Sequence, residues 1–249
     1  MNKITIEPFP DTDRNEVITH SKALQDAVSA YDVLRILKVV TAEYGFGFFS
    51  VIRFPTEEDT SLRGLSLLTN WPAELVHEYD EHDLLQNSPI IDALKVSMVP
   101  YSWTLFELNT YRPSDKAEAA NRIFSEHGFL AGTYFPVIDG IGNRGAVSFS
   151  GTRPPCTEKE QIKLSWISSQ LFQRVVHFDG NQKMRRPKLT DREIECLRWT
   201  SSGKTSIEIA AILNLSEHTI NHYISTCCDK LSATNRAHAV AKGIRLGLI

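Results

Sequence analysis

Two closely spaced helix starts near the end of the chain constrain its fold more than any other feature. Thr190 is followed three residues later by Glu193, and Thr205 is followed in the same way by Glu208. This spacing is typical of a capping box at a helix N-terminus. Gly203 lies just before the second start, where a chain reversal needs free dihedral angles. The pattern predicts a helix-turn-helix, in which one helix crosses the DNA backbone and the next enters the major groove.

The segment after this turn has the apolar spacing of a helix with one buried side. Ile220, Ile224, Cys227 and Leu231 recur at intervals of four, three and four residues, so they form one stripe. The other faces are polar, with side chains that can hydrogen-bond base edges or bind phosphates. The predicted DNA contacts are Lys204, Thr205, Ser216, Thr219, Asn221, His222, Ser225, Thr226, Lys230 and Arg236. For any single one of them, a solvated helix surface is the simpler alternative.

Charge is distributed unevenly between this segment and the rest of the chain. Residues 183–249 carry 11 lysines and arginines and 6 acidic residues, whereas residues 1–182 carry 16 and 24. An acidic body with a basic C-terminal segment fits nucleic-acid contact by that segment alone. Double-stranded DNA is therefore the expected macromolecular partner.

Composition and missing motifs argue against several other classes of protein. No apolar run approaches the roughly 18–20 residues that span a bilayer, and the first 16 residues lack the apolar core of a secretory signal, so we expect a cytoplasmic protein with no membrane contact. The four cysteines lack the paired spacing of a metal site, so we expect reduced thiols and no metal. No catalytic motif is complete, so we predict no catalytic residues and no cofactor. An enzyme and a structural adaptor remain the alternative classes.

A polar segment at residues 179–187 separates two strongly patterned regions. It contains Gly180 and Pro187, and it is predicted to be a linker. It divides the chain into a first domain of residues 1–178 and a small helical domain of residues 188–249.

Helical and strand patterns alternate within the first domain, which predicts an α+β fold with an antiparallel sheet between helices. Helices are predicted at 15–43, 72–82, 89–96, 113–128 and from Thr157, and strands at 46–54, 64–71, 99–103, 132–140 and 144–151. The last two strands form a hairpin, in which Pro136 requires an edge position or a bulge. A small molecule can bind between the sheet and the helices of such a domain.

Residues 189–249 resemble the LuxR-type helix-turn-helix, the C-terminal module of quorum-sensing regulators. The resemblance rests on LTxRE at 189–193, GKT at 203–205, EIA at 208–210, TIN at 219–221 and the terminal GLI. It implies that the last helix, at about Asn235–Leu246, helps to pair two DNA-binding domains, so that a homodimer binds a dyad-symmetric site. Many family members have basic residues where this chain has Asn221 and Ser225, so we expect its base preference to differ.

Residues 20–178 resemble, more loosely, the autoinducer-binding domain that recognises N-acyl-homoserine lactones. Trp71 lies where the family often has a tyrosine that donates to the acyl carbonyl, and Tyr79 matches a family tyrosine. Leu75 replaces a tryptophan that donates to the lactone carbonyl, and Ser88 replaces an aspartate that accepts the amide N–H. The other matches are Trp103, Gly132 beside the pocket, and Ser148 near the polar head of the ligand. The predicted ligand site is Trp71, Leu75, Tyr79, Ser88, Trp103 and Ser148.

These two replacements leave three ligand hypotheses open. A serine hydroxyl offers a neutral hydrogen bond worth ~1 kcal/mol where a carboxylate offers ~1.5–3 kcal/mol, and leucine offers none. The chain binds a homoserine lactone through a rearranged set that includes Trp71 and Ser88, binds another small apolar signal, or needs no ligand. Core packing explains the aromatic residues equally well.

Overall fold

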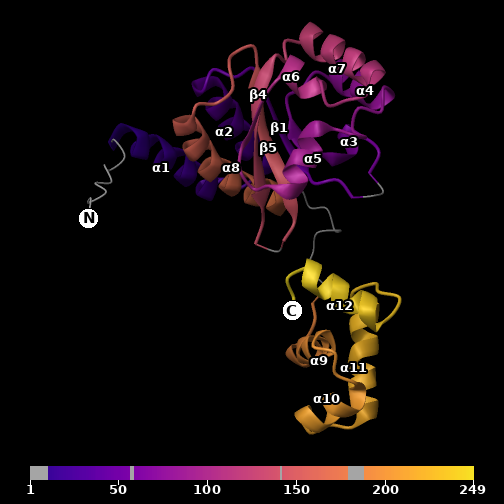
Figure 1. The fold of residues 1–249 in the computed structure, drawn as a ribbon. Helices are drawn as coiled ribbons and strands as arrows, with labels where there is room; N and C mark the ends of the chain where they lie inside the picture. The colour runs from indigo at the N-terminus through magenta and orange to yellow at the C-terminus, as the bar shows by residue number, and fades with distance from the viewer. Residues whose placement is uncertain (1–10, 57–58, 141, 179–187) are drawn as a thin grey trace, which may run out of the picture. The chain divides into compact units, whose positions relative to one another are not determined.

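The computed structural model of the chain describes residues 11–56, 59–140, 142–178 and 188–249 (Figure 1). The chain divides into two compact units, one within Met1–Asp139 and Asn143–Gly180 and the other within Gly140–Gly142 and Asn181–Ile249. Each unit is described by itself. The predicted linker at 179–187 lies outside the described residues. None of the helices described here is long and apolar enough to cross a membrane.

The N-terminal unit is a five-stranded antiparallel sheet with helices on both faces, as predicted (Figure 1). Its helices are α1 (Asp11–Asp26), α2 (Ala30–Glu43), α3 (Leu62–Leu65), α4 (Ala73–Glu81), α5 (Pro89–Val96), α6 (Leu105–Asn109), α7 (Ser114–Glu126) and α8 (Glu158–Phe178). Its strands are β1 (Phe48–Arg53), β2 (Ser66–Thr69), β3 (Tyr101–Thr104), β4 (Ala131–Ile138) and β5 (Arg144–Gly151).

Strand β5 is the centre of the sheet, because the strand order is β2–β1–β5–β4–β3. Strands β4 and β5 form the predicted hairpin. Strand β3 pairs with β4 over four residues only, from Tyr101 opposite Tyr134 to Thr104 opposite Ala131. Pro136 therefore lies where β4 has a partner on one side only, and this position tolerates the missing N–H of proline.

Alternate residues of the strands face two separate hydrophobic cores, as the period of two in a strand requires. On β5, Val147 and Phe149 pack with residues of α1, α2 and α8. Ala146 points to the opposite face and packs with residues of α4 to α7. The sheet therefore separates a core made with α1, α2 and α8 from a second core made with α4 to α7.

The single helix predicted at 15–43 is wrong, because the chain forms two helices with a break between them. Ser29 has extended backbone angles and caps α2 by accepting from the Asp32 N–H. The Asp32 carboxylate in turn accepts from the Val28 N–H at 3.2 Å. Val28 and Tyr31, which flank the break, are 83% and 67% exposed. The side-chain caps of Ser29 and Asp32 stop the first helix and start the second.

The C-terminal unit consists of four helices: α9 (Asp191–Ser201), α10 (Ser206–Leu213), α11 (Glu217–Lys230) and α12 (Arg236–Arg245). Both predicted capping boxes are present, at the starts of α9 and α10, and Ser216 caps α11 by accepting from the Thr219 N–H. The predicted stripe of α11, from Ile220 to Leu231, is buried. Helix α12 occupies the segment predicted for the last helix.

An ion pair between the exposed Lys230 and the buried Glu193 joins the first and third helices of this unit. Lys230 Nζ, at the end of α11, donates to both carboxylate oxygens of Glu193 at 2.8 Å. The Glu193 carboxylate also accepts from the Thr190 N–H as part of the α9 capping box. Burial raises the pKa of Glu193, but the bonds from Lys230 and Thr190 outweigh it, so the pKa of Glu193 lies below its usual range.

We predict that Gly145→Ala destabilises the N-terminal unit by about 1–3 kcal/mol, the usual cost of overpacking a core. A Cβ at this position would lie 2.5 Å from the Ile52 carbonyl oxygen and would overlap the Phe172 ring. Gly47→Ala is the control, because a Cβ there meets nothing within 4 Å. Hydrogen exchange of the full chain measures the local stability. Equal protection in the two variants would contradict the prediction.

We also predict that the C-terminal unit loses stability in acid through Glu193. Because its pKa is lowered in the folded state, its contribution is present above the unfolded value of about 4.3 and is lost as the pH falls through the folded value. Glu193→Gln should cost about 1–2 kcal/mol near neutral pH and should flatten this pH dependence. Hydrogen exchange of residues 188–249 measures both effects. Glu195→Gln, on the same helix, serves as the control, and an unchanged pH dependence in Glu193→Gln would refute the assignment.

Candidate ligand site and nucleic-acid interface

The sheet face toward α4 to α7 carries small and polar residues at its centre. In the strand register, Ser148 of β5 lies opposite Ser50 of β1 and opposite Tyr134 of β4. Gly132 of β4 lies opposite Trp103 of β3. A Cβ on Gly132 would come within 3.0 Å of Trp103 Nε1, so glycine makes room for the indole. This face therefore carries small and polar residues at positions where a sealed core would have large apolar side chains.

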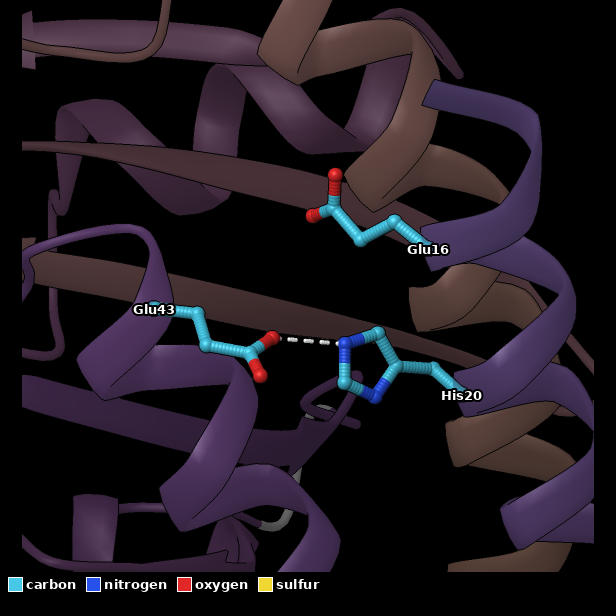
Figure 2. A group of neighbouring side chains, drawn as sticks. All are labelled: Glu16, His20 and Glu43. Carbon is cyan, nitrogen blue, oxygen red and sulfur yellow. Dashed lines mark hydrogen bonds and ion pairs between the residues drawn. The ribbon is translucent and has the colours of Figure 1, made fainter. Parts of the chain in front are cut away.

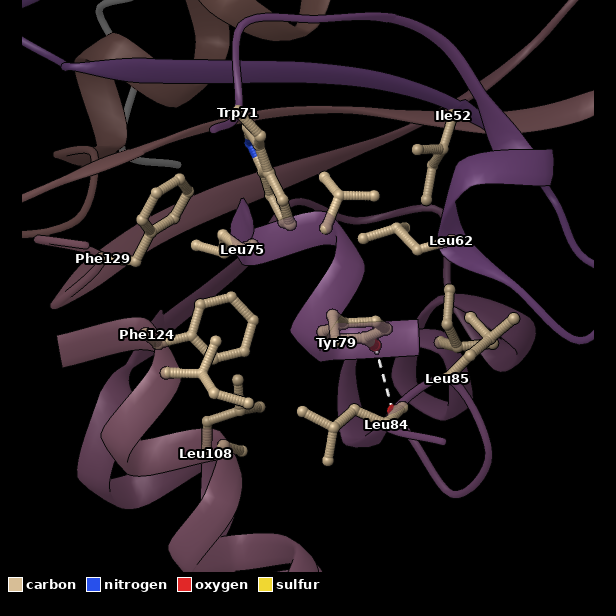
Figure 3. Packing of buried hydrophobic residues seen from close by; sticks show 14 of the residues in the cluster. Ile52, Leu62, Trp71, Leu75, Tyr79, Leu84, Leu85, Leu108, Phe124 and Phe129 are labelled. Carbon is tan, nitrogen blue, oxygen red and sulfur yellow. Dashed lines mark hydrogen bonds between the residues drawn. The ribbon is translucent and has the colours of Figure 1, made fainter. Parts of the chain in front are cut away.

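Helix α4 supplies the wall opposite this sheet face. Pro72 precedes its first residue, a favourable place for proline, and Trp71 stands just before it. Leu75 and Tyr79 follow at spacings of four residues, so the three side chains lie on one side of the helix (Figure 3). All three belong with Trp103 to one buried cluster. The structure thus brings together four residues that were predicted to bind the ligand.

Aromatic rings from α7 and from the segment before β4 complete this cluster. The ring of Phe124 lies 6.2 Å from that of Trp71 and 6.4 Å from that of Trp103. Phe129 packs against Trp71 at 4.9 Å (Figure 3). Leu75, which is fully buried, extends the apolar surface where the sequence had suggested a lost hydrogen-bond donor. The cluster therefore suits an apolar chain or ring.

Three polar atoms at the predicted site are buried without a hydrogen-bond partner among the described residues. They are Trp71 Nε1, Trp103 Nε1 and Ser148 Oγ. A buried donor or acceptor left unsatisfied costs about 1–3 kcal/mol, so such groups are rare unless a ligand or water uses them. These atoms come from the residue before the α4 cap, from β3 and from β5, and they have the chemistry to bind acceptor groups of a small molecule.

Ser88 also has a structural role at this position. It caps α5, where its Oγ accepts from the Ile91 N–H at 3.5 Å. Its hydroxyl also lies close enough to the Tyr79 phenol to affect it: burial raises the pKa of Tyr79, while Ser88 and Arg112 act in the opposite direction. Ser88 therefore lies at the candidate site, but its Oγ already accepts a hydrogen bond from the backbone of α5.

Two residues of this region were missed by the sequence prediction. Tyr134 lies opposite Ser148 and belongs to the cluster, and the alternation of side chains along β4 could have identified it. Arg112 follows α6 and is only 8% exposed. It also lines a surface cavity of ≈ 730 Å³ that lies between the start of α5 and the end of α6. No pattern in the sequence marks this arginine, because its burial depends on how α4, α6 and β3 pack.

A second group of side chains has the residue types of a metal site. Glu16, His20 and Glu43 each place one possible ligand atom within 4.8 Å of the others (Figure 2). His20 Nε2 lies 2.7 Å from Glu43 Oε2, however, and Lys163 Nζ donates to Glu16 at 2.9 Å. The Lys163 ammonium opposes a further cation there, and the bonds join α1 to α2 and α8. We therefore assign this group to helix packing.

The predicted DNA contacts of the C-terminal unit fall into four structural groups. Thr205 and Ser216 cap helices, with Thr219 bonded to Ser216 at 2.8 Å. Lys204 and Lys230 are paired with Glu208 and Glu193. Arg236 donates to the Lys204 carbonyl at 3.2 Å, and Thr226 bonds to the His222 carbonyl within α11. The remaining contacts, Asn221, His222 and Ser225, are exposed on α11.

Asn221 is held in place by the preceding helix. Its Oδ1 accepts from Ser206 Oγ, at the start of α10, at 2.6 Å. This bond holds the amide in one orientation, and the amide nitrogen makes no bond within the described residues. An oriented amide can form the paired donor and acceptor contacts that distinguish adenine. Ser206, which the sequence prediction did not include, is therefore a positioning residue for this face.

Comparison with known proteins is consistent over both units. Residues 29–176 match the family model described as an autoinducer binding domain, and residues 187–242 match that of bacterial regulatory proteins of the luxR family. AhyR of Aeromonas hydrophila, a transcriptional activator protein, is 30% identical over 189 residues, covering 74% of this chain and 73% of AhyR. LuxR of Aliivibrio fischeri, also a transcriptional activator protein, is 29% identical over 223 residues, covering 86% of this chain and 85% of LuxR.

Solved structures show the same fold. Escherichia coli SdiA matches with a TM-score of 0.74 and 22% sequence identity, over 95% of this chain and 98% of SdiA. The family consists of transcriptional regulators, so the enzyme alternative is set aside. The chain belongs to the LuxR family of quorum-sensing transcriptional regulators, with an autoinducer-binding domain and a helix-turn-helix that binds DNA.

Proposed function

We propose that the autoinducer-binding domain holds a signal of the N-acyl-homoserine lactone class between the sheet and α4. The observation that carries this proposal is the set of unpartnered polar atoms on Trp71, Trp103 and Ser148 inside an apolar cluster. Carbonyl oxygens of such a ligand would accept from the indole N–H groups. Its acyl chain would pack on the aromatic rings around Phe124. No other cofactor is needed for this function.

The second part of the proposal concerns the oligomeric state in which the chain binds DNA. A homodimer, acting in the cytoplasm, binds a dyad-symmetric site through two copies of α11, with half-sites about one helical turn apart. Helix α12 is the proposed pairing surface, because Ile244 on it is 58% exposed and the apolar residues that follow it are partly exposed. Binding of the signal then favours one arrangement of the dimer over another.

The DNA interface is tested by selecting duplexes from a random-sequence library with the full chain and measuring affinity in a salt titration. We expect the selected sequences to be dyad-symmetric. The logarithm of the binding constant should fall by about 0.9 for each tenfold rise in salt concentration and for each phosphate neutralised. Asn221→Ala should weaken binding to the selected duplex about tenfold or more and leave a scrambled duplex unaffected. Ser206→Ala should give an intermediate loss, because it removes only the bond that orients Asn221.

Gln173→Ala, exposed on α8 of the other unit, is the control for these variants. Selection of sequences without dyad symmetry would overturn the proposed dimer. An equal loss on selected and scrambled duplexes would remove Asn221 from base recognition.

The ligand site is tested with the indole N–H groups. Trp71→Phe removes the donor and keeps an aromatic ring, so affinity for a bound acyl-homoserine lactone should fall about fivefold to tenfold. Trp166→Phe is the matched control, because that indole donates to Ser21 on the outside of the unit. A thermal shift with a panel of lactones, followed by calorimetry, measures the loss. If no lactone stabilises the wild-type chain, the proposed ligand class is wrong.

A further inference from the structure

Arg112 is a buried cation whose partners are all neutral. Its Nε donates to Asn109 Oδ1 at 3.1 Å and its Nη1 to the Leu84 carbonyl at 2.8 Å. Asn109 is itself buried, and its amide nitrogen donates to Asn121. Among the described residues, Arg112 forms no ion pair, because no carboxylate oxygen lies within 4.0 Å of its guanidinium nitrogens. Charged side chains are almost never buried unless they are paired, so this arginine lacks the counter-charge that its burial calls for.

The guanidinium still has capacity to bind. Its second terminal nitrogen, Nη2, makes no hydrogen bond within the described part of the chain, whereas Nε and Nη1 are held by Asn109 and Leu84. Arg112 lines the ≈ 730 Å³ cavity together with Pro89, Tyr101, Tyr111 and other residues. A rigid guanidinium with one unused edge at a cavity is well suited to bind an anion.

Arg112 also connects this cavity to the proposed ligand site. The Leu84 carbonyl accepts from both Arg112 Nη1 and the Tyr79 hydroxyl, at 2.8 and 3.0 Å. Burial also raises the pKa of Tyr134, and the Arg112 charge acts weakly against that rise. Tyr79 and Tyr134 both belong to the aromatic cluster. Arg112, which lines the cavity, and Tyr79, which belongs to the cluster, are therefore joined through the Leu84 carbonyl.

The polar groups around this site are mainly donors. Trp71 Nε1 and Trp103 Nε1 donate only, as does Arg112. The buried polar residues described in the N-terminal unit are histidine, serine, threonine, asparagine and arginine, and none of them is a carboxylate. A ligand that fits has acceptors at its polar end. One negative charge would match the single guanidinium, whereas the nearby Asp92 carboxylate, which is paired with Lys95, disfavours a doubly charged phosphate.

We propose that Arg112 is an anion-binding residue of the ligand site, and that the preferred signal is an amphiphile with an apolar tail and a carboxylate head. This inference rests on the proposed function, because it assumes that the N-terminal unit binds a small molecule. It predicts one departure from the proposed ligand class: an N-acyl-homoserine, in which the lactone ring is opened to a carboxylate, binds more tightly than the closed lactone.

The test compares two ligands that differ only in this ring. N-octanoyl-homoserine lactone and N-octanoyl-homoserine are titrated into the full-length chain by calorimetry, at a slightly acidic pH that preserves the lactone. We expect the carboxylate to bind at least tenfold more tightly, the difference that one charge-assisted hydrogen bond makes. Arg112→Met should remove this preference by weakening the carboxylate at least tenfold with little change for the lactone. Arg112→Lys should keep part of it.

Arg122→Met is the matched control, because Arg122 is an exposed arginine of α7 that pairs with Glu78 and Glu126. It should keep the wild-type preference. If Arg112→Met does not fold, the salt dependence of ligand affinity in the wild-type chain tests the proposal instead. Only the affinity for the carboxylate should weaken as salt rises.

Equal wild-type affinities for the two compounds, or equal losses of both in Arg112→Met, would overturn the anion site while leaving the proposed function in place. If neither compound binds, both the anion site and the proposed lactone class are overturned, and the Trp71→Phe experiment fails as well.

Discussion

The pairing of β5 with β1 on one side and β4 on the other is the constraint on which the N-terminal unit depends. It fixes which side chains of the sheet face each core, because a shift of one residue would exchange the two faces. Val147 and Phe149 then seal the core against α2 and α8, and Ser148 and Tyr134 are left opposite each other on the other face. One face of the sheet is thus committed to stability, which allows the other to carry polar groups that cost free energy unless they bind something.

The helix-turn-helix could be predicted almost completely from the sequence because its determinants are local. Each capping box is set by two residues three positions apart, and the stripe of α11 repeats within single turns. The same methods failed at residues 27–29, where the apolar spacing continued through Val28 and concealed a break. The break is also local, but it depends on the side chains of Ser29 and Asp32 capping the backbone, and periodicity does not detect capping inside an apparent helix.

The sequence predicted part of the candidate ligand site, and the residues that it missed have a physical explanation. Trp71, Leu75 and Tyr79 are spaced at helical intervals, so their convergence followed once α4 was predicted. Arg112 is separated from Leu84 by 28 positions, and only the tertiary fold brings them together. A buried cation has no recognisable sequence spacing, although it changes the charge of the site more than any residue that the sequence had marked.

The charges of the DNA-binding unit suggest how recognition depends on the proposed dimer. Lys204 and Lys230 are paired with glutamates, and the exposed contacts of α11 are mostly neutral hydrogen-bonding groups. Such contacts discriminate between base pairs, but they supply little of the electrostatic attraction that holds a protein on DNA. A single domain should therefore bind weakly. Two linked domains gain affinity because the second binding event is intramolecular, so a signal that changes the spacing of the proposed pair would control DNA binding without altering any contact of α11.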